Sequence, residues 1–348
     1  MIIHPFTEHI IEEIQKLEDD KSAKISNLDD LWKRTRNIIE ERFNADSSLF
    51  SSLGLGFHHI ETAGINMIDR VVESYCNGDV SGALQIVKDL LFDSKTGKYN
   101  FSTYSWGKVR RESGVTETVS YRMRANENYE RYTREELFHA PFNNLKNVGT
   151  QRYSMIGFPC LYLGESLYNC WEEIKRPDLE KVNFARFVHY EKLELLDLVF
   201  PSDYKSEKDF VQAAIVMMCS KSVIDDNAKF KYEYVFPQLI LQSMIENKRY
   251  KGIRYLSTKF ISGKSLFPNN ADIMMNYVIP VEKVTSSTKY CKGLSSIFKL
   301  TEPKAYFVDF LRDNLPGVKV RATGYQGSVL FAYEEQLKTE DLKHPTYI

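Results

Sequence analysis

The sequence predicts an α+β fold, with an all-helical N-terminal part followed by a domain that mixes strands and helices. In the first part of the chain, apolar residues recur at helical spacing after polar cap residues. After residue 100, short apolar segments of strand length are interspersed irregularly with helical segments. An irregular order favours an α+β domain over a regular array of alternating strands and helices. A length of 348 residues allows two domains of this kind.

Amphipathic spacing and cap residues define the helices expected at the N-terminus. Ser26 is expected to cap the second helix and Ser81 to open the last one, while Asn77-Gly78 ends the helix between them. The expected helices are residues 6–17, a helix from Ser26 through Phe43, residues 60–75 and residues 81–91. The polar, turn-forming segment 93–98 follows, and it predicts a boundary between a domain of residues 1–97 and a domain of residues 98–348.

Beyond this boundary, segment length and residue type distinguish the expected strands from the expected helices. The expected strands are Val119–Arg124, Phe158–Leu163, Val182–His189, Leu195–Phe200, Gly252–Ser257, Asp272–Val281 and Ser328–Tyr333. The expected helices are Ser166–Lys175, Glu207–Lys221, Glu233–Asn247 and one near Lys304–Asn314.

Composition narrows the class of protein. With 43% hydrophobic and 27% charged residues, most of the chain is expected to fold. A net charge of -1 provides no basic field for direct nucleic-acid binding. The five cysteines form no CxxC pair, which favours reduced thiols over a disulfide framework or a zinc site. No leader pattern and no apolar segment of membrane-spanning length is found, so we expect a cytoplasmic protein without a membrane partner.

The most informative stretch runs from Gly149 to Ile174. It combines Arg152 in a turn-like segment, Tyr162 in an apolar strand, and Glu172 and Glu173 on the helix that follows. An arginine can clamp a phosphate, and a tyrosine offers a stacking face and a hydroxyl. A carboxylate can hold a sugar hydroxyl and stabilise a nearby cation. Together these groups suit a nucleotide whose sugar bond is to be cut.

Helix geometry separates the two glutamates. The apolar face of the expected helix carries Leu167, Cys170, Trp171 and Ile174. At about 100° per residue, Glu172 is expected nearly opposite this face and Glu173 at its edge. Glu173 is therefore the better candidate for a cleft, and two solvated glutamates are the alternative.

Further candidates lie at strand positions. Arg122 and Arg124 alternate with apolar residues, so both are expected on one face of a strand, with an exposed strand edge as the alternative. Ser257 closes a strand, where a serine more often serves as a turn or helix cap. No metal is expected, because the neighbouring His58 and His59 lack an acid–histidine spacing. No nucleotide-binding GxGxxG or Walker pattern and no GxSxG elbow is present.

In these motifs the chain resembles the RES-domain family, which is named for an arginine, a glutamate and a serine far apart in sequence. The glutamate of the family lies eleven residues after a tyrosine, which singles out Glu173 after Tyr162. The resemblance covers residues 115–285 approximately, and its motif arginine is Arg122 or Arg124, with Arg122 preferred. The matching positions are Tyr121-Arg122, Gln151-Arg152-Tyr153-Ser154, Gly157 to Leu163, Glu173, Tyr232, Pro237-Gln238 and Gly252 to Ser257.

Some positions depart from the family pattern. Gln151 stands where many relatives have glycine, and Ser154 where many have asparagine. Residues 1–95 lie outside the domain that the resemblance covers. They are similar in length and helicity to the HEPN-like N-terminal domain of longer relatives, but they contain no convincing Arg-to-His ribonuclease motif.

The resemblance implies a fold like the ADP-ribosyltransferases, a mixed β core with flanking helices, and an activity on NAD+ as substrate. Many members of the family look like the toxins of toxin–antitoxin pairs. The implied reaction is cleavage of the nicotinamide–ribose bond with water or phosphate as acceptor, and transfer of ADP-ribose to a protein is an alternative. By this resemblance Glu173 faces the ribose and its developing cation, Arg122 and Arg152 hold the phosphates, Tyr162 stacks and Ser257 orients.

A non-enzymatic binding module that acts through the N-terminal helices is the third hypothesis. The sequence leaves the acceptor and the oligomeric state open. It also leaves open whether an antitoxin or another inhibitory protein binds the chain.

Overall fold

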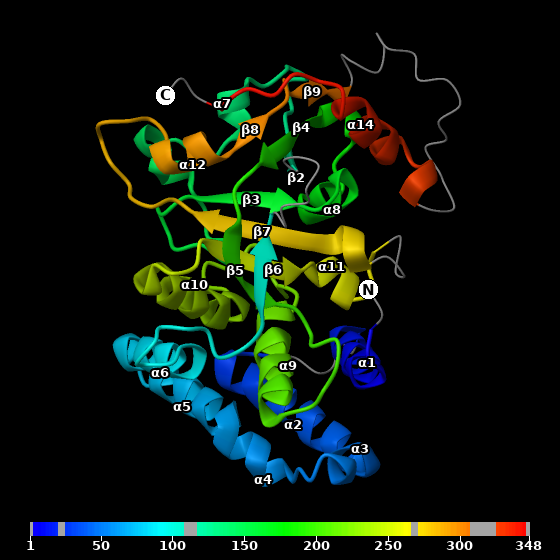
Figure 1. Cartoon of the computed structure of the whole chain (residues 1–348), viewed down its shortest axis with the longest axis vertical. Coiled ribbons are helices and arrows are strands. Elements are labelled where there is room, and N and C mark those ends of the chain that lie inside the picture. The colour runs from blue at the N-terminus through cyan, green and yellow to red at the C-terminus, as the bar shows by residue number, and fades with distance from the viewer. Residues whose placement is uncertain (1–2, 20–24, 108–116, 266–270, 307–324, 346–348) are drawn as a thin grey trace, which may run out of the picture. The chain divides into compact units, whose positions relative to one another are not determined.

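The computed structural model describes residues 3–19, 25–107, 117–265, 271–306 and 325–345 (Figure 1). The chain divides into two compact units. Unit 1 comprises Met1–Tyr104, Gln151–Tyr153 and Leu195–Lys264, and unit 2 comprises Ser105–Thr150, Ser154–Glu194 and Ser265–Ile348. Helices occur together with parallel and antiparallel strand pairs, which confirms the predicted α+β class. The likeness to ADP-ribosyltransferases and the domain boundary at residue 97 stay predictions.

Unit 1 is mostly helical. Its first helices pack through the apolar faces that the sequence predicts, and α5 and α6 lie side by side (Figure 1). These N-terminal elements are α1 (Pro5–Asp19), α2 (Leu28–Ala45), α3 (Ser47–Ser52), α4 (Phe57–Ile60), the π-helical turn η1 (Glu61–Ile65), α5 (Asn66–Cys76) and α6 (Val80–Leu91). The expected helix 60–75 is therefore interrupted by a π-helical turn at its start.

The interruption has a packing reason. A Cβ atom at Gly64 would lie 2.4 Å from Cγ1 of Val211, so only glycine allows η1 to approach α9 (Glu207–Ser220) this closely. The sequence prediction misplaced the cap residues of α2 and α6 by one or two positions. Asn27, not Ser26, caps α2, and Asp79, not Ser81, caps α6. Each accepts the backbone N–H three residues on, which is the usual capping geometry.

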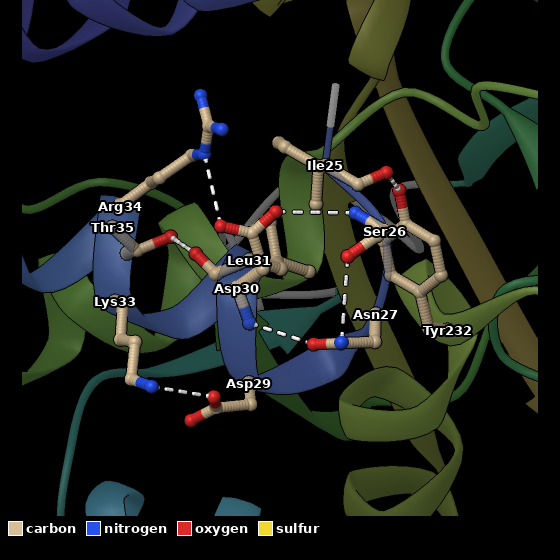
Figure 2. A network of polar contacts seen from close by, with 10 residues as sticks. All are labelled: Ile25, Ser26, Asn27, Asp29, Asp30, Leu31, Lys33, Arg34, Thr35 and Tyr232. Carbon is tan, nitrogen blue, oxygen red and sulfur yellow. Dashed lines mark hydrogen bonds and ion pairs between the residues drawn. The ribbon is translucent and has the colours of Figure 1, made fainter. Parts of the chain in front are cut away.

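Polar side chains surround the start of α2 (Figure 2). Asp30 accepts hydrogen bonds from the backbone N–H of Ser26 and from Nε of Arg34, at 3.1 and 3.2 Å. The hydroxyl of Tyr232 donates to the carbonyl oxygen of Ile25 at 2.9 Å. Tyr232, one of the family-motif positions, thus holds the segment that leads into α2.

The remaining elements of unit 1 come from the middle of the chain. They are β1 (Thr103–Trp106), β5 (Leu193–Leu198), α9, the 3-10 turn η4 (Tyr232–Tyr234), α10 (Val235–Asn247), β6 (Gly252–Leu256) and α11 (Thr258–Ile261), with β1 and β5 each running across a unit boundary. Strands β5 and β6 pair in parallel, with Leu196 opposite Ile253. Helix α6 packs against α10, so the N-terminal helices share their compact unit with a distant part of the sequence.

Unit 2 is built on antiparallel strands. β2 (Thr118–Ala125) lies between β3 (Cys160–Gly164) and β4 (Val182–His189), and β3 also pairs with β7 (Met275–Pro280) (Figure 1). Because β2 has a neighbouring strand on each side, the alternative that Arg122 and Arg124 lie on an exposed strand edge is wrong. The other elements are α7 (Arg134–Leu137), η2 (Phe142–Asn147), α8 (Leu167–Glu173), η3 (Leu179–Lys181), η5 (Ala271–Met274), α12 (Lys292–Ile297), β8 (Lys299–Leu300), β9 (Lys304–Ala305), η6 (Tyr325–Gly327) and α14 (Val329–Leu337).

Two predictions near the C-terminus need correction. The segment Ser328–Tyr333 is not a strand: Ser328 caps α14 by accepting the N–H of Phe331. Its buried residues Val329, Leu330, Tyr333 and Leu337 follow helical spacing, which the apolar run at the start of the segment obscured. Of the helix expected near Lys304–Asn314, residues 304–305 form β9, and residues 307–324 lie outside the described part of the chain.

Candidate functional site

Two arginines occupy the middle of β2, between β3 and β4. Nη1 of Arg122 donates to the backbone carbonyl oxygen of Tyr162 at 2.5 Å, and Nη2 of Arg124 donates to that of Phe138 at 2.8 Å. Both side chains are partly buried. Within the described residues, neither guanidinium pairs with a carboxylate, and Nε of Arg122 is buried without a hydrogen-bond partner.

The electrostatics of this pair are unfavourable for a cation. Burial lowers the pKa of Arg122 well below its usual range, and the charge of Arg124 lowers it further. Burial also lowers the pKa of Arg124, although Tyr132, Tyr290 and Glu136 act in the opposite direction. No carboxylate comparable to Glu136 raises the pKa of Arg122, so Arg122 is the more isolated cation of the two. A negatively charged ligand would offset the desolvation of these cations and their mutual repulsion.

His139 lies close enough to both arginines for their charges to lower its pKa. Burial is the larger cause, and together these effects lower the pKa of His139 to about 4. Its Nδ1 bonds the carbonyl oxygen of Ala140 at 2.8 Å, and its Nε2 accepts the backbone N–H of Cys291 at 2.9 Å. The imidazole is therefore neutral at pH 7 and adds no positive charge beside the arginines.

Glu173, at the C-terminal end of α8, is exposed. One of its oxygens, Oε1, accepts a hydrogen bond from Nδ2 of Asn276 on β7 at 2.7 Å. Strand β7 pairs with β3, where partly exposed Tyr162 lies opposite Val278. Unit 2 thus places Arg122, Tyr162 and Glu173 on β2, β3 and α8, three elements in direct contact with one another.

The predicted orientation of Glu172 is wrong. Its side chain is only 1% exposed. It accepts a hydrogen bond from the hydroxyl of Tyr168 and forms an ion pair with Nε of Arg176 at 2.7 Å. The helical-wheel estimate failed because α8 is covered on more than its apolar side: Tyr168 and Asn169 are also buried. Glu172 is thus a buried, satisfied group, whereas Glu173 meets solvent.

The thiol of Cys170 lies on the same helix and is not a nucleophile. Burial raises its pKa to about 12, so it stays protonated at neutral pH. It contacts the carbonyl oxygen of Tyr121 at 3.3 Å, and the neighbouring Gly164 leaves room for it: a Cβ atom there would lie 2.8 Å from its sulfur. Cys170 is therefore a packing residue between α8 and the sheet.

Buried Glu334 on α14 holds the other end of α8. It accepts the backbone N–H of Leu167, the first residue of α8, and a hydrogen bond from the hydroxyl of Tyr325. Burial raises the pKa of its carboxyl from 4.5 to about 7, although both hydrogen bonds oppose this rise. The C-terminal helix thereby fixes the helix that carries Glu173.

This pKa predicts a pH-dependent stability. Between pH 4.5 and 7 the folded protein keeps a proton on Glu334 that the unfolded chain has lost, so the free energy of unfolding falls as the pH rises. The expected fall is about 3 kcal/mol across this window. Urea unfolding at pH 5 and pH 8 should show that Glu334→Gln flattens this dependence, with the exposed neighbour change Glu335→Gln as control. An unchanged dependence in Glu334→Gln would contradict the assignment.

Unit 1 contains the other two predicted site residues. Nη1 and Nη2 of Arg152 donate to the carbonyl oxygens of Cys219 and Lys221, at 2.8 and 2.7 Å, where α9 ends. Its guanidinium also lies 5.2 Å from the ring centre of Tyr234. Arg152 therefore holds a helix end, and the N–H groups of its guanidinium that these two bonds do not use are what it can offer to a phosphate. Ser257 is fully buried and caps α11 by accepting the N–H of Lys259.

Asn276 and Glu334 are not among the site residues that the sequence predicts. Both are polar residues in otherwise buried segments, a signal that the sequence contains but that propensity alone does not interpret. The described residues hold no cluster of three or more potential metal ligands. In the same part of the chain, every helix is too short or too polar to cross a membrane.

Comparison with known proteins gives one informative relative. A protein of Bacillus subtilis (strain 168) named "Putative toxin YopC" is 33% identical to this chain over 207 residues. The match covers 53% of this chain and 46% of that protein, so the chain spans about half the length of the relative. No family model matches the chain. No solved structure matches it either. The chain is thus similar to a toxin-named protein, and its place in the RES-domain family stays a prediction.

Proposed function

We propose that this protein is an NAD+-consuming, toxin-like enzyme that cleaves the nicotinamide–ribose bond with water or phosphate as acceptor. The observation that carries the proposal is the pair Arg122 and Arg124 on β2, which face no paired carboxylate among the described residues. Two adjacent, desolvated cations favour an anionic ligand, and a diphosphate carries the charge and the oxygen atoms that guanidinium groups bind.

The exposed carboxylate of Glu173 supplies the chemistry in this proposal. Cleavage of the nicotinamide–ribose bond builds positive charge on the ribose. A fixed negative charge near that carbon lowers the barrier, because it interacts more strongly with the transition state than with the substrate. Tyr162 is partly exposed on β3 and offers a stacking surface for a planar ring. The roles of Arg152 at a phosphate and Ser257 in orientation stay predictions from the family resemblance.

The same site would also suit transfer of ADP-ribose to a protein, and one experiment separates the acceptors. NAD+ labelled in its adenine is incubated with the purified protein, with and without phosphate and with a cell extract. Label in ADP-ribose indicates water, label in ADP-ribose 1″-phosphate indicates phosphate, and label in the protein fraction indicates transfer. We expect label in small products. Label confined to protein would replace cleavage by transfer, and label remaining in NAD+ under all conditions would contradict both.

A further inference from the structure

Two buried asparagines in unit 2 connect the backbone of β7 to the carboxylate of Glu173. Nδ2 of Asn169 donates to the carbonyl oxygen of Met275 and to Oδ1 of Asn276, both at 2.8 Å. Nδ2 of Asn276 then donates to Oε1 of Glu173 at 2.7 Å. Asn169 is fully buried and Asn276 is 5% exposed, so solvent cannot readily replace either amide.

The direction of these hydrogen bonds is fixed by chemistry. The carbonyl oxygen of Met275 can only accept, so Asn169 must turn its NH₂ group toward it. The same NH₂ group meets Asn276, which must therefore present its oxygen. The NH₂ group of Asn276 is then left to face Glu173. A backbone carbonyl thus sets the orientation of both amides and aims a donor at the carboxylate.

The surrounding fold leaves space for this arrangement. Asn276 lies opposite Gly164 in the β3–β7 pair, and a Cβ atom at Gly164 would lie 3.3 Å from Nδ2 of Asn169. Asn169 itself is held in the first turn of α8, where its backbone N–H bonds the cap residue Ser166. The start of α8 positions Asn169 and the β3–β7 register positions Asn276, so the placement of both amides does not depend on Glu173.

We propose that Asn276, oriented by Asn169, is the positioning residue that fixes the carboxylate of Glu173 for catalysis. This inference rests on the proposed function of Glu173, whose exposed carboxylate receives this hydrogen bond from a buried, oriented amide. A donor held in one orientation keeps the negative charge in place without reorganisation during the reaction. Asn276 acts through Glu173, so its loss should affect turnover more than binding of NAD+.

The test compares Asn276→Ala with Asn183→Ala. Asn183 is a matched control: it is 1% exposed on β4, and its amide bonds the N–H of Tyr132 and the carbonyl oxygen of Glu130. For Asn276→Ala we expect kcat to fall about 10- to 100-fold, the range for losing one hydrogen bond to a charged group, with KM for NAD+ changed less than about threefold. Asn183→Ala should lower Tm while kcat stays within about twofold. Equal kcat losses in both variants, or none in Asn276→Ala, would overturn the proposal.

Asn276→Asp covers the case in which Asn276→Ala fails to fold. Aspartate has the shape of asparagine and still accepts from Asn169, but it presents an oxygen to Glu173 in place of a donor. We expect a kcat loss at least as large as in Asn276→Ala, and normal kcat in folded Asn276→Asp would contradict the proposal. Asn169→Ala should also lower kcat, and by less than additively when combined with Asn276→Ala.

Crystal structures separate failure of this inference from failure of the proposed function. The carboxylate of Glu173 should leave its position in Asn276→Ala and keep it in Asn183→Ala. If the wild-type protein does not consume NAD+, the proposed function fails, and the structures still decide whether Asn276 positions Glu173. If the carboxylate keeps its place in Asn276→Ala, the positioning role is wrong whatever the activity.

Discussion

Replacing Glu173 by glutamine is expected to lower the rate of NAD+ cleavage by about 10²–10³-fold, the typical cost of removing one preorganised charge from a transition state. Glutamine keeps the size of the side chain and an oxygen that can accept from Nδ2 of Asn276. The loss would therefore report on charge rather than on packing. Because Glu173 is exposed, circular dichroism and Tm should barely change. The measurement is single-turnover cleavage of saturating NAD+.

Glu172→Gln is the matched control on the same helix. Glu172 is buried and interacts with Tyr168 and Arg176, so the change should weaken folding by about 1–3 kcal/mol. The fraction that stays folded should turn over NAD+ at a normal rate. An inactive, folded Glu172→Gln beside a fully active Glu173→Gln would show that the catalytic carboxylate has been misassigned.

Replacing Arg122 by methionine is expected to raise KM for NAD+ by about 10- to 100-fold, because one charged hydrogen-bonding group to the diphosphate is lost. The same change should leave stability unaltered or higher. Arg122 is a desolvated cation without a paired carboxylate among the described residues, and replacing such a charge by an unbranched apolar side chain removes a desolvation cost. Arg122→Met should therefore weaken NAD+ binding without lowering stability, whereas replacing a purely structural arginine would lower stability.

Arg124→Met provides the comparison, because the two arginines lie on one strand and differ in their surroundings. Glu136, Tyr132 and Tyr290 lie near Arg124 and favour its charge, so its replacement should cost stability and affect KM less. A larger KM effect for Arg124→Met would make Arg124 the motif arginine. A loss of stability without a change in KM for both variants would remove the phosphate-binding role from β2.

Much of the fold followed from local pattern. The expected strand Val182–His189 coincides with β4, where every residue is buried, including the polar residues Asn183, Arg186 and His189. Its length and its β-branched and aromatic residues were sufficient to predict a strand. Helices α9 and α10 were likewise predicted to within two residues of their observed bounds, from segment length and residue type. Ser328–Tyr333 failed because a short apolar run has the same appearance in a strand and in a buried helix turn, and the capping role of Ser328 decides between them.

The candidate site could be predicted only in part. Arg122, Tyr162 and Glu173 were proposed from strand and helix position and from the family resemblance, and the structure places them on neighbouring elements of unit 2. The burial of Glu172 could not be read from the helix alone, because it depends on which residues cover α8. Asn276 contacts Glu173 across 103 positions of sequence, so only the sheet register reveals it. Arg152 and Ser257 were found as motif residues, but their helix-capping contacts required the structure.

The division of the chain into two compact units also could not be predicted from local sequence patterns. Residues 1–97 are helical as expected, yet α6 packs against α10, and both belong to the compact unit that includes residues 195–264. Sequence composition marks the turn at 93–98 but contains no record of which distant helix the preceding one contacts. Whether residues 1–97 fold on their own stays a prediction.

The most direct test of the central claim is incubation of the purified full chain with NAD+ for several hours at micromolar enzyme concentration, with and without phosphate, beside Glu173→Gln. Products are identified by mass. We predict that the wild-type protein converts NAD+ to nicotinamide and an ADP-ribose product, while Glu173→Gln leaves most NAD+ intact. A co-purifying inhibitory protein is excluded beforehand by denaturing electrophoresis. NAD+ that remains intact with the folded, uninhibited wild-type protein under both conditions would contradict the account.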